Sequence, residues 1–167
     1  MYNLRERYRN CISRVVLFSP WLDLSPSSKI MSAKKISDEI LNQDVFKKSV
    51  TDYTYAENTK IPSVSPLLAE DSQLQNFPPT FIQMGSKEIL LEDAKEFAAR
   101  LRENGNTCEL DIWKGMMFMF QMADEYLHES HLALDKVGKV VTQDSAGIES
   151  VEIQNKPKLE HSLHSEA

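Results

Sequence analysis

Residues Phe77–Gln121 read FPPTFIQMGSKEILLEDAKEFAARLRENGNTCELDIWKGMMFMFQ, and this stretch decides the fold. Thr80–Met84 is a short β-prone run that ends at a Gly-Ser turn. Apolar residues recur at steps of three and four through Ile89–Asn104, which predicts an amphipathic helix. Gly105 is suited to stop that helix, and Thr107–Trp113 alternates as a second strand. Strand, helix and strand at this spacing predict a right-handed βαβ unit with parallel strands.

The rest of the chain extends this α/β pattern. Val15–Phe18 is a continuous apolar run, typical of a strand covered on both faces, and Pro20 follows it. Helices are predicted over Ser37–Tyr55 and Met122–Val141, and loops over Ser25–Ser32 and Asn58–Asp71. We therefore expect a mostly parallel sheet with flanking helices in residues 1–141. Residues 142–167 are polar and aperiodic, which predicts a disordered tail.

Composition excludes several classes of protein. A chain of 167 residues is about one domain, and its net charge of −6 argues against nucleic-acid binding. Val15–Phe18 is too short for a signal peptide or a membrane span. Cys11 and Cys108 form neither a disulfide framework nor a metal-ligand pair. We expect an intracellular soluble chain with reduced thiols and no cofactor, whose three-stranded sheet leaves an exposed edge open to self-association.

Three stretches carry a resemblance to a known family. They are SPWLDLS (Ser19–Ser25), SVSPLLAED (Ser63–Asp71), and Pro78–Gly105 followed by Glu109–Gln121. In this order and spacing they resemble the C-terminal part of the hormone-sensitive-lipase-like branch of the α/β-hydrolase fold. That branch includes carboxylesterases, arylacetamide deacetylases and fungal sterol deacetylases. The resemblance implies a partial α/β-hydrolase fold without its N-terminal half, and a small or lipid ester as the family substrate.

The family also implies a catalytic triad of Ser, His and an acid. The resemblance maps the acid to Glu88, at the tip of the second predicted strand. An alternative reading is an ordinary acidic residue at a helix start, stabilised by the helix dipole. The histidine maps to the loop Gly115–Gln121, where Phe118 occupies its place. A phenyl ring cannot accept a proton, so the general base is absent from this position.

Other residues offer weak substitutes for the missing catalytic groups. His128 and His131 fall on the following predicted helix, and His161 and His164 fall in the predicted tail. The nucleophile elbow, Gly-x-Ser-x-Gly, belongs before Ser19 in the family and does not occur in this sequence. Gln143–Gly147 reads QDSAG and resembles an elbow core, but it has no strand before it.

Some features of this stretch have both a functional and a structural interpretation. The methionines of the loop after the third predicted strand fit an acyl pocket or a loop packed onto the sheet edge. They are Met116, Met117, Met119 and Met122. The charged residues of the central helix are predicted to form a solvated face. They are Glu92, Asp93, Lys95, Glu96, Arg100 and Arg102.

Three functions are compatible with this sequence. The first is a truncated or degenerate esterase relative that is inactive alone. The second is a non-catalytic binding or regulatory partner of a full-length relative. The third is a fragment of a complete esterase, in which coding sequence upstream would supply the nucleophile and the oxyanion loop.

Overall fold

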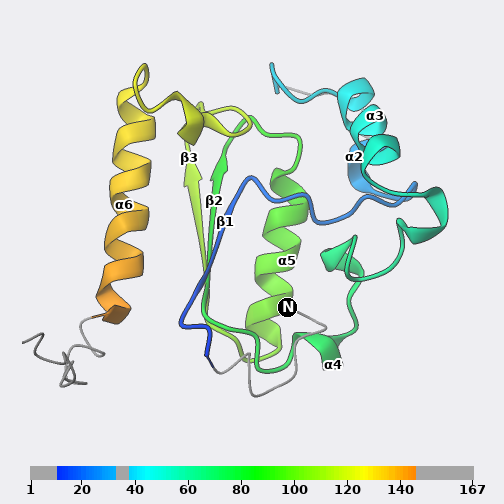
Figure 1. Cartoon of the computed structure of the whole chain (residues 1–167), viewed down its shortest axis with the longest axis horizontal. Coiled ribbons are helices and arrows are strands. Elements are labelled where there is room, and N and C mark those ends of the chain that lie inside the picture. Colours follow the sequence, from blue (N-terminus) through cyan, green and yellow to red (C-terminus); the bar gives the residue numbers. More distant parts are fainter. Residues whose placement is uncertain (1–10, 33–37, 146–167) are drawn as a thin grey trace, which may run out of the picture.

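A computed structural model describes residues 11–32 and 38–145, and its centre is a three-stranded parallel sheet (Figure 1). The strands are β1 (Val15–Phe18), β2 (Thr80–Gly85) and β3 (Cys108–Trp113), in the order β1-β2-β3. Both pairings are parallel. The predicted α/β class and all three predicted strands are confirmed.

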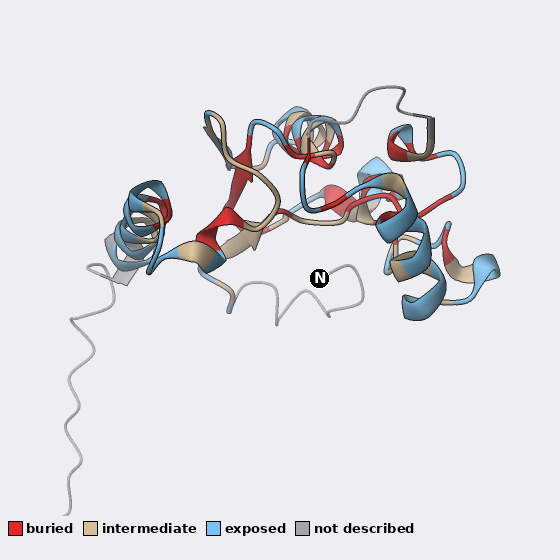
Figure 2. Ribbon diagram, turned by 90° about the horizontal axis from the view of Figure 1, so that it is seen from above, coloured by how far each residue is buried: buried red, intermediate tan, exposed pale blue. Residues whose placement is uncertain are grey.

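Helices α5 (Leu91–Glu103) and α6 (His128–Ser145) cover opposite faces of the sheet (Figure 2). On the α5 face, Ile82 and Met84 are fully buried against the helix, because residues of alternate position in a strand share one face. On the α6 face, Lys136 of the helix lies 5.5 Å from the ring centre of Phe81. All six residues of β2 are buried, as expected for a central strand covered on both sides.

The central helix follows the predicted stripe, with one correction. Its apolar residues Ala94, Phe97, Ala98 and Leu101 are buried. Gly105 follows with a φ of 78°, the left-handed conformation predicted for a stop residue. Asp93, however, is 1% exposed, so its assignment to the solvated face was wrong. The aspartate lies on the side of the helix that faces the core.

The segment between β1 and β2 contains more short helices than predicted. They are α2 (Lys29–Ser32), α3 (Gln43–Tyr53), the 3₁₀ turns η1 (Ala56–Asn58) and η2 (Pro66–Leu68), and α4 (Asp71–Leu74). The predicted loops Ser25–Ser32 and Asn58–Asp71 are thus partly helical. The helix predicted from Ser37 begins only at Gln43, because the Asn42 side chain accepts the backbone N–H groups of Asp44 and Val45 and caps it there. Residues 33–37 lie outside the described residues.

The last helix begins later and ends later than predicted. Met122 was expected to begin the helix and Tyr126 to lie on its apolar side, but they are 80% and 84% exposed and precede α6. The 3₁₀ turn η3 (Phe120–Ala123) replaces the expected helix start. The tail predicted from Thr142 is also wrong over its first four residues, since α6 continues to Ser145. The remainder, 146–167, lies outside the described residues.

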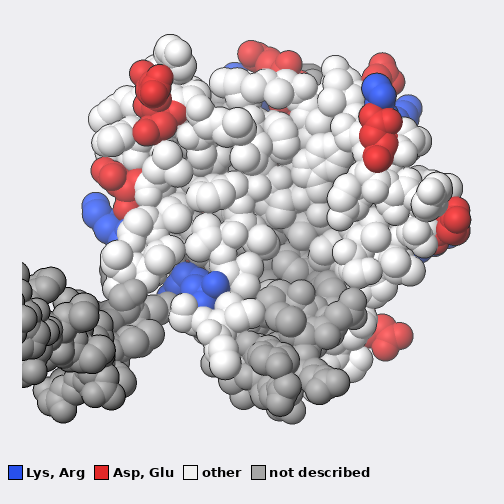
Figure 3. Space-filling view, in the orientation of Figure 1, with Lys and Arg blue, Asp and Glu red and all other residues white. Residues whose placement is uncertain are grey.

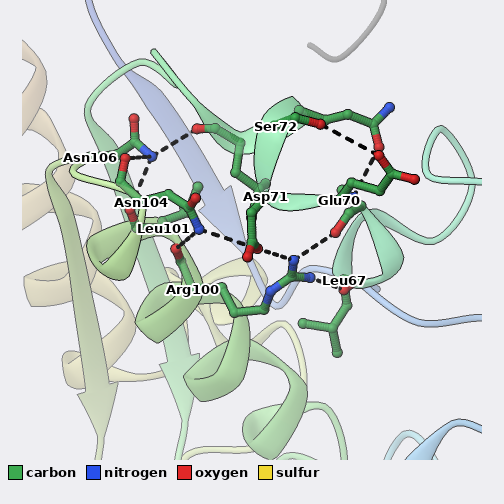
Figure 4. A network of polar contacts seen from close by, with 11 residues as sticks. Leu67, Glu70, Asp71, Ser72, Arg100, Leu101, Asn104 and Asn106 are labelled. Atoms are coloured by element: carbon green, nitrogen blue, oxygen red, sulfur yellow. Dashed lines mark hydrogen bonds and ion pairs between the residues drawn. The ribbon is translucent and has the colours of Figure 1, made fainter.

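Arg100 ties α5 to the segment that precedes β2 (Figure 4). Its guanidinium donates to the carbonyl oxygens of Leu67 at 2.6 Å and Ala69 at 2.7 Å. It also donates to Asp71 Oδ1 at 2.6 Å. The hydrogen bonds from Arg100 and Asn104 lower the pKa of the Asp71 carboxyl. One planar cation therefore supplies hydrogen-bond donors to two backbone carbonyls at and just after η2.

Substitution of Arg100 by alanine should destabilise the fold by about 1–3 kcal/mol, because it removes the donors of two carbonyl groups. Asp71→Asn is the matched control. The Asp71 side chain is 70% exposed, and loss of its charge leaves both carbonyl contacts of Arg100 in place. Urea unfolding followed by circular dichroism measures both variants. An equal loss of stability in the two variants would show that the ion pair, not the carbonyl contacts, carries the effect.

Candidate functional site

The carboxyl group of Glu88 lies buried at the C-terminal end of β2. Glu88 is 5% exposed. Its Oε1 atom accepts hydrogen bonds from Ser19 Oγ at 2.9 Å and from the Gly85 backbone N–H at 2.5 Å. Its Oε2 atom is buried and has no partner among the described residues. The carboxyl therefore has one fully engaged oxygen and one free oxygen.

Ser19 connects this carboxyl to the loop after β3. It follows β1 directly with a φ of 43°, and its Oγ accepts the backbone N–H of Met119 at 3.2 Å. Met119 is itself left-handed, with a φ of 53°. One hydroxyl thus bridges the ends of β1 and β2 and the residue next to Phe118. This is the carboxyl edge of the parallel sheet, where open α/β sheets place their ligands.

The turn after β2 and the loop after β3 also meet through their backbones. Ser86 N–H donates to the Trp113 carbonyl at 2.9 Å, and Lys87 N–H donates to the Met116 carbonyl at 3.0 Å. A Cβ atom on Gly85 would lie 2.3 Å from the Met116 carbonyl oxygen, far inside contact distance. Position 85 therefore requires glycine, because only glycine allows the two segments to approach this closely.

Phe118 packs against an aromatic ring on one side and borders an open groove on the other. It is half-buried, and its ring lies 6.3 Å from that of Trp21 in an edge-on arrangement. Trp21 in turn stacks on Phe46 at 5.0 Å. A groove of about 360 Å³ runs along the same loop and is lined by Met117, Phe118, Met119, Phe120, Met122, Ala123, Tyr126, Leu127 and Ile40. The surroundings of position 118 are thus mainly apolar and suit a phenyl ring.

Burial raises the pKa of Glu88 to about 7. The hydrogen bonds from Gly85 and Ser19 favour the charged form and oppose this shift, whereas the nearby Asp38 carboxylate adds to it. Burial likewise raises the pKa of Asp93 to about 7, with the charge of Asp23 acting in the same direction. The two carboxyls share one cause: a charge taken out of water without a cationic partner close enough to compensate.

The histidines of the described residues lie elsewhere. His128 and His131 are exposed in the first turns of α6, as expected for solvated helix residues. His131 Nδ1 lies 3.0 Å from Asp124 Oδ1, and no described hydrogen bond joins either ring to Glu88. His161 and His164 lie outside the described residues. In residues 11–32 and 38–145 there is also no group of three or more side chains arranged to bind a metal ion.

A sequence model of the α/β-hydrolase fold family matches residues 1–122. The chain belongs to this family. An esterase of Acinetobacter venetianus is 30% identical over 131 residues, which cover 78% of this chain and 42% of the esterase. The hormone-sensitive lipase of Bos taurus is 34% identical over 82 residues, covering 47% of this chain and 11% of the lipase.

The solved structures point to the same branch of the family. A hormone-sensitive lipase from a metagenome library superposes with a TM-score of 0.71 at 28% identity. The match covers 79% of this chain and 44% of the lipase. The partial α/β-hydrolase fold and its resemblance to hormone-sensitive lipases are therefore confirmed. The chain spans less than half the length of each of these relatives. Where the structure is described, no helix has the length and apolar character needed to cross a bilayer.

Sequence reasoning missed the contact between Ser19 and Glu88. Ser19 was interpreted as part of the strand stop before Pro20 and of the SPWLDLS stretch, and 69 residues separate it from the carboxyl. The one local signal is a serine directly after an apolar strand, at the sheet edge where Glu88 was also expected. That placement puts a hydroxyl within reach of the carboxyl, although the sequence does not determine the pairing.

The raised pKa of Glu88 predicts that the chain loses stability as the pH rises from about 4.5 to about 7. In this window the folded chain holds a proton that the unfolded chain has released, so unfolding releases it and is favoured at higher pH. The loss should be on the order of 2 kcal/mol for this one group. Urea unfolding at several pH values gives the slope, and Glu88→Gln should flatten it.

Glu103→Gln is the matched control for this measurement, since it removes an exposed carboxylate from the end of α5. The control should keep the slope of the wild-type chain. Asp93→Asn should reduce the slope in the same sense as Glu88→Gln, because burial raises both carboxyl pKa values. A wild-type stability that rises over this pH window would contradict the assignment.

Proposed function

We propose that this chain is a catalytically silent member of the α/β-hydrolase family, in which residues 1–141 form the C-terminal portion of the domain. Glu88 stands at the inherited acid position and Phe118 at the position of the base. The observation that carries this proposal is the residue at position 118. Its backbone neighbour Met119 is joined through Ser19 to Glu88, so position 118 lies beside the acid, yet it bears a phenyl ring.

The chemistry of ester hydrolysis explains why this substitution matters. A serine hydroxyl becomes a nucleophile only when a neighbouring base removes its proton. The acid of a triad acts through the imidazole that it orients, and it has nothing to orient here. Gln143–Ser145, the start of the one elbow-like motif, is the end of helix α6 and not a strand-to-helix turn.

Ester ligands remain the class that fits the site best. The relatives are named esterase and hormone-sensitive lipase, and the groove beside Phe118 is lined mostly by methionine, phenylalanine and other apolar side chains. Such a groove accommodates the acyl part of a small or lipid ester, because methionine adapts to irregular apolar shapes. Binding without turnover is therefore the proposed residual activity, in keeping with a binding or regulatory role.

A second candidate is a fragment of a longer esterase. The matches cover 42% of the Acinetobacter esterase and 44% of the metagenomic lipase, which favours it. The coding DNA upstream of Met1 distinguishes the two. An in-frame Gly-x-Ser-x-Gly motif would support the fragment, although a chain extended in this way would still carry Phe118 in place of the base.

The purified chain should not hydrolyse p-nitrophenyl acetate faster than the same amount of heat-denatured chain. The reason is the absence of a general base at position 118. Release of p-nitrophenolate measures the rate, and Glu88→Ala controls for reactions of surface groups. Turnover above the denatured control that disappears in Glu88→Ala would refute the proposal.

Phe118→His tests the assignment of the two positions without relying on turnover. If position 118 faces the acid as proposed, the carboxylate should raise the pKa of the introduced imidazole, and Glu88→Gln in the same background should lower it again. Nuclear magnetic resonance of the ring protons of the introduced histidine measures both values. If Glu88→Gln leaves the pKa of the introduced imidazole unchanged, position 118 does not face the acid.

A further inference from the structure

Asp38 connects the turn that carries Glu88 to the segment that precedes α3. Its Oδ2 accepts the N–H of Ile89, the residue after Glu88, at 3.2 Å. Its Oδ1 accepts the N–H groups of Ile40 and Leu41, each at 3.0 Å. Three backbone donors from two parts of the chain therefore converge on one carboxyl, which holds the segment before α3 against the turn after β2.

This segment, residues 38–42, also contributes to the core and to the apolar groove. Leu41 is 2% exposed and packs in the main hydrophobic core. Ile40 lines the groove that runs along Phe118 and Met119. The docking of the segment against the turn after β2 therefore sets the position of one wall of the groove.

Asp38 and Glu88 are two acidic side chains that lie near each other and away from water. Figure 3 shows that acidic side chains on the visible face lie mainly at its rim, whereas Asp38 is 7% and Glu88 5% exposed. A charge on one of them disfavours a charge on the other, because water screens the repulsion poorly at buried positions. The charge of Asp38 accordingly adds to the effect of burial, which raises the pKa of Glu88 to about 7.

The other segments that pack around Glu88 bring mainly neutral groups to it. The end of β1 contributes the Ser19 hydroxyl, and the loop Met116–Met119 contains only apolar side chains. Lys87, in the same turn as Glu88, lies 3.8 Å from the carboxylate of Glu39, which is 72% exposed. The charge of this lysine is thus shared with an acid in water.

The buried acid of α5 belongs to a different group of charges. Asp93 responds to the charges of Asp23 and Lys29, and not to that of Glu88. Within the described part of the chain, Asp38 is therefore the one charged side chain that acts on the pKa of Glu88. Described residues bury both carboxyls, so the contact between them does not depend on which surfaces of the chain are exposed.

We propose that Asp38 positions this site through a contact that depends on a proton. While Glu88 carries the proton, Asp38 holds residues 38–42 docked, and when Glu88 ionises the segment loosens. The reason is that ionisation adds a second negative charge beside the carboxylate that accepts the three docking hydrogen bonds. The coupling is reciprocal, so docking favours the protonated form of Glu88 to the same extent.

The groove is affected as well, because Ile40 forms part of its wall. An apolar ligand in the groove should bind more weakly once Glu88 has lost its proton and the wall has loosened. This consequence rests on the proposed function, which places an ester ligand there. The coupling between Asp38 and Glu88 does not rest on it.

Amide hydrogen exchange followed by nuclear magnetic resonance tests the docking. After correction for the intrinsic effect of pH, protection of the Ile40, Leu41 and Ile89 amides should fall about threefold to tenfold as the pH rises through about 7. In Glu88→Gln, which keeps an acceptor oxygen but cannot ionise, protection should not change with pH. Glu39→Gln is the matched control, since it removes an exposed carboxylate from the same segment and should behave like the wild-type chain.

The amides of β2 distinguish local docking from overall stability in the same samples. All six residues of β2 are buried, so its amides should exchange only when the whole fold opens. The three docking amides should be less protected than those of β2, because they are exposed by a local opening. Their pH dependence then reports on the segment and not on global unfolding.

Titration of the Glu88 carboxyl, followed by its carbon-13 resonance, tests the role of Asp38 directly. Asp38→Asn removes the charge and the acceptor of the Ile89 N–H. It should lower the pKa of Glu88, so that its acid dissociation constant becomes about threefold to tenfold larger. Glu39→Gln should leave this constant unchanged. If Asp38→Asn does not fold, the exchange of the wild-type chain and of Glu88→Gln still decides the matter.

Three results would overturn the proposal. They are docking amides as protected as those of β2, a pH dependence of their protection that persists in Glu88→Gln, and a Glu88 carboxyl that titrates identically in folded Asp38→Asn. None of these variants changes Phe118, and none of the measurements involves ester turnover. Failure of the coupling is therefore distinct from failure of the proposed function.

Discussion

The buried side-chain amide of Gln83 holds the sheet, the loop after it and helix α6 in one arrangement. Gln83 is fully buried in the middle of β2. Its Nε2 donates to Asp111 Oδ2 and to the Ala133 carbonyl, each at 3.1 Å, and its Oε1 accepts Gln121 Nε2 at 3.0 Å. An amide buried without partners would cost several kcal/mol in this apolar setting. β3, η3 and α6 therefore each supply a hydrogen-bond partner to this one side chain.

The helices that cover the two faces of the sheet make different kinds of contact with it. This difference affects how well each helix could be predicted from the sequence. α5 is held by apolar burial, which leaves a stripe of helical period in the sequence, so its extent was predicted to within two residues at each end. α6 makes polar contacts with the sheet, through its Ala133 carbonyl to Gln83 and through Lys136 to Asp111. Such contacts leave no periodic signal, and the exposed apolar residues Met122 and Tyr126 suggested a helix start that does not exist.

Local hydrogen bonds explain the other differences from prediction. Asp38 was expected in the first turn of a helix, but its Oδ1 accepts the N–H groups of Ile40 and Leu41, and its Oδ2 accepts Ile89 N–H at 3.2 Å. A carboxylate that bonds to its own following backbone competes with helix formation. The helix therefore starts later, after Asn42. Asp93 was misassigned for a related reason, since the sequence shows its charge but not the burial around it.

The contacts of Glu88 give its carboxyl a structural role that does not depend on catalysis. Its Oε1 joins the end of β1, through Ser19, to the turn after β2, through Gly85. Removing the carboxyl would leave both donors buried without an acceptor, which is costly whether or not an ester is ever hydrolysed. On the proposed assignment, a carboxyl at position 88 would be preserved by this structural role without a base beside it. Position 118 has no comparable constraint, because a phenyl ring there packs against Trp21 and no described buried donor depends on it. The contacts of Glu88 are therefore accounted for by the fold, and on the proposed assignment the residue at position 118 is the one that bears on the chemistry.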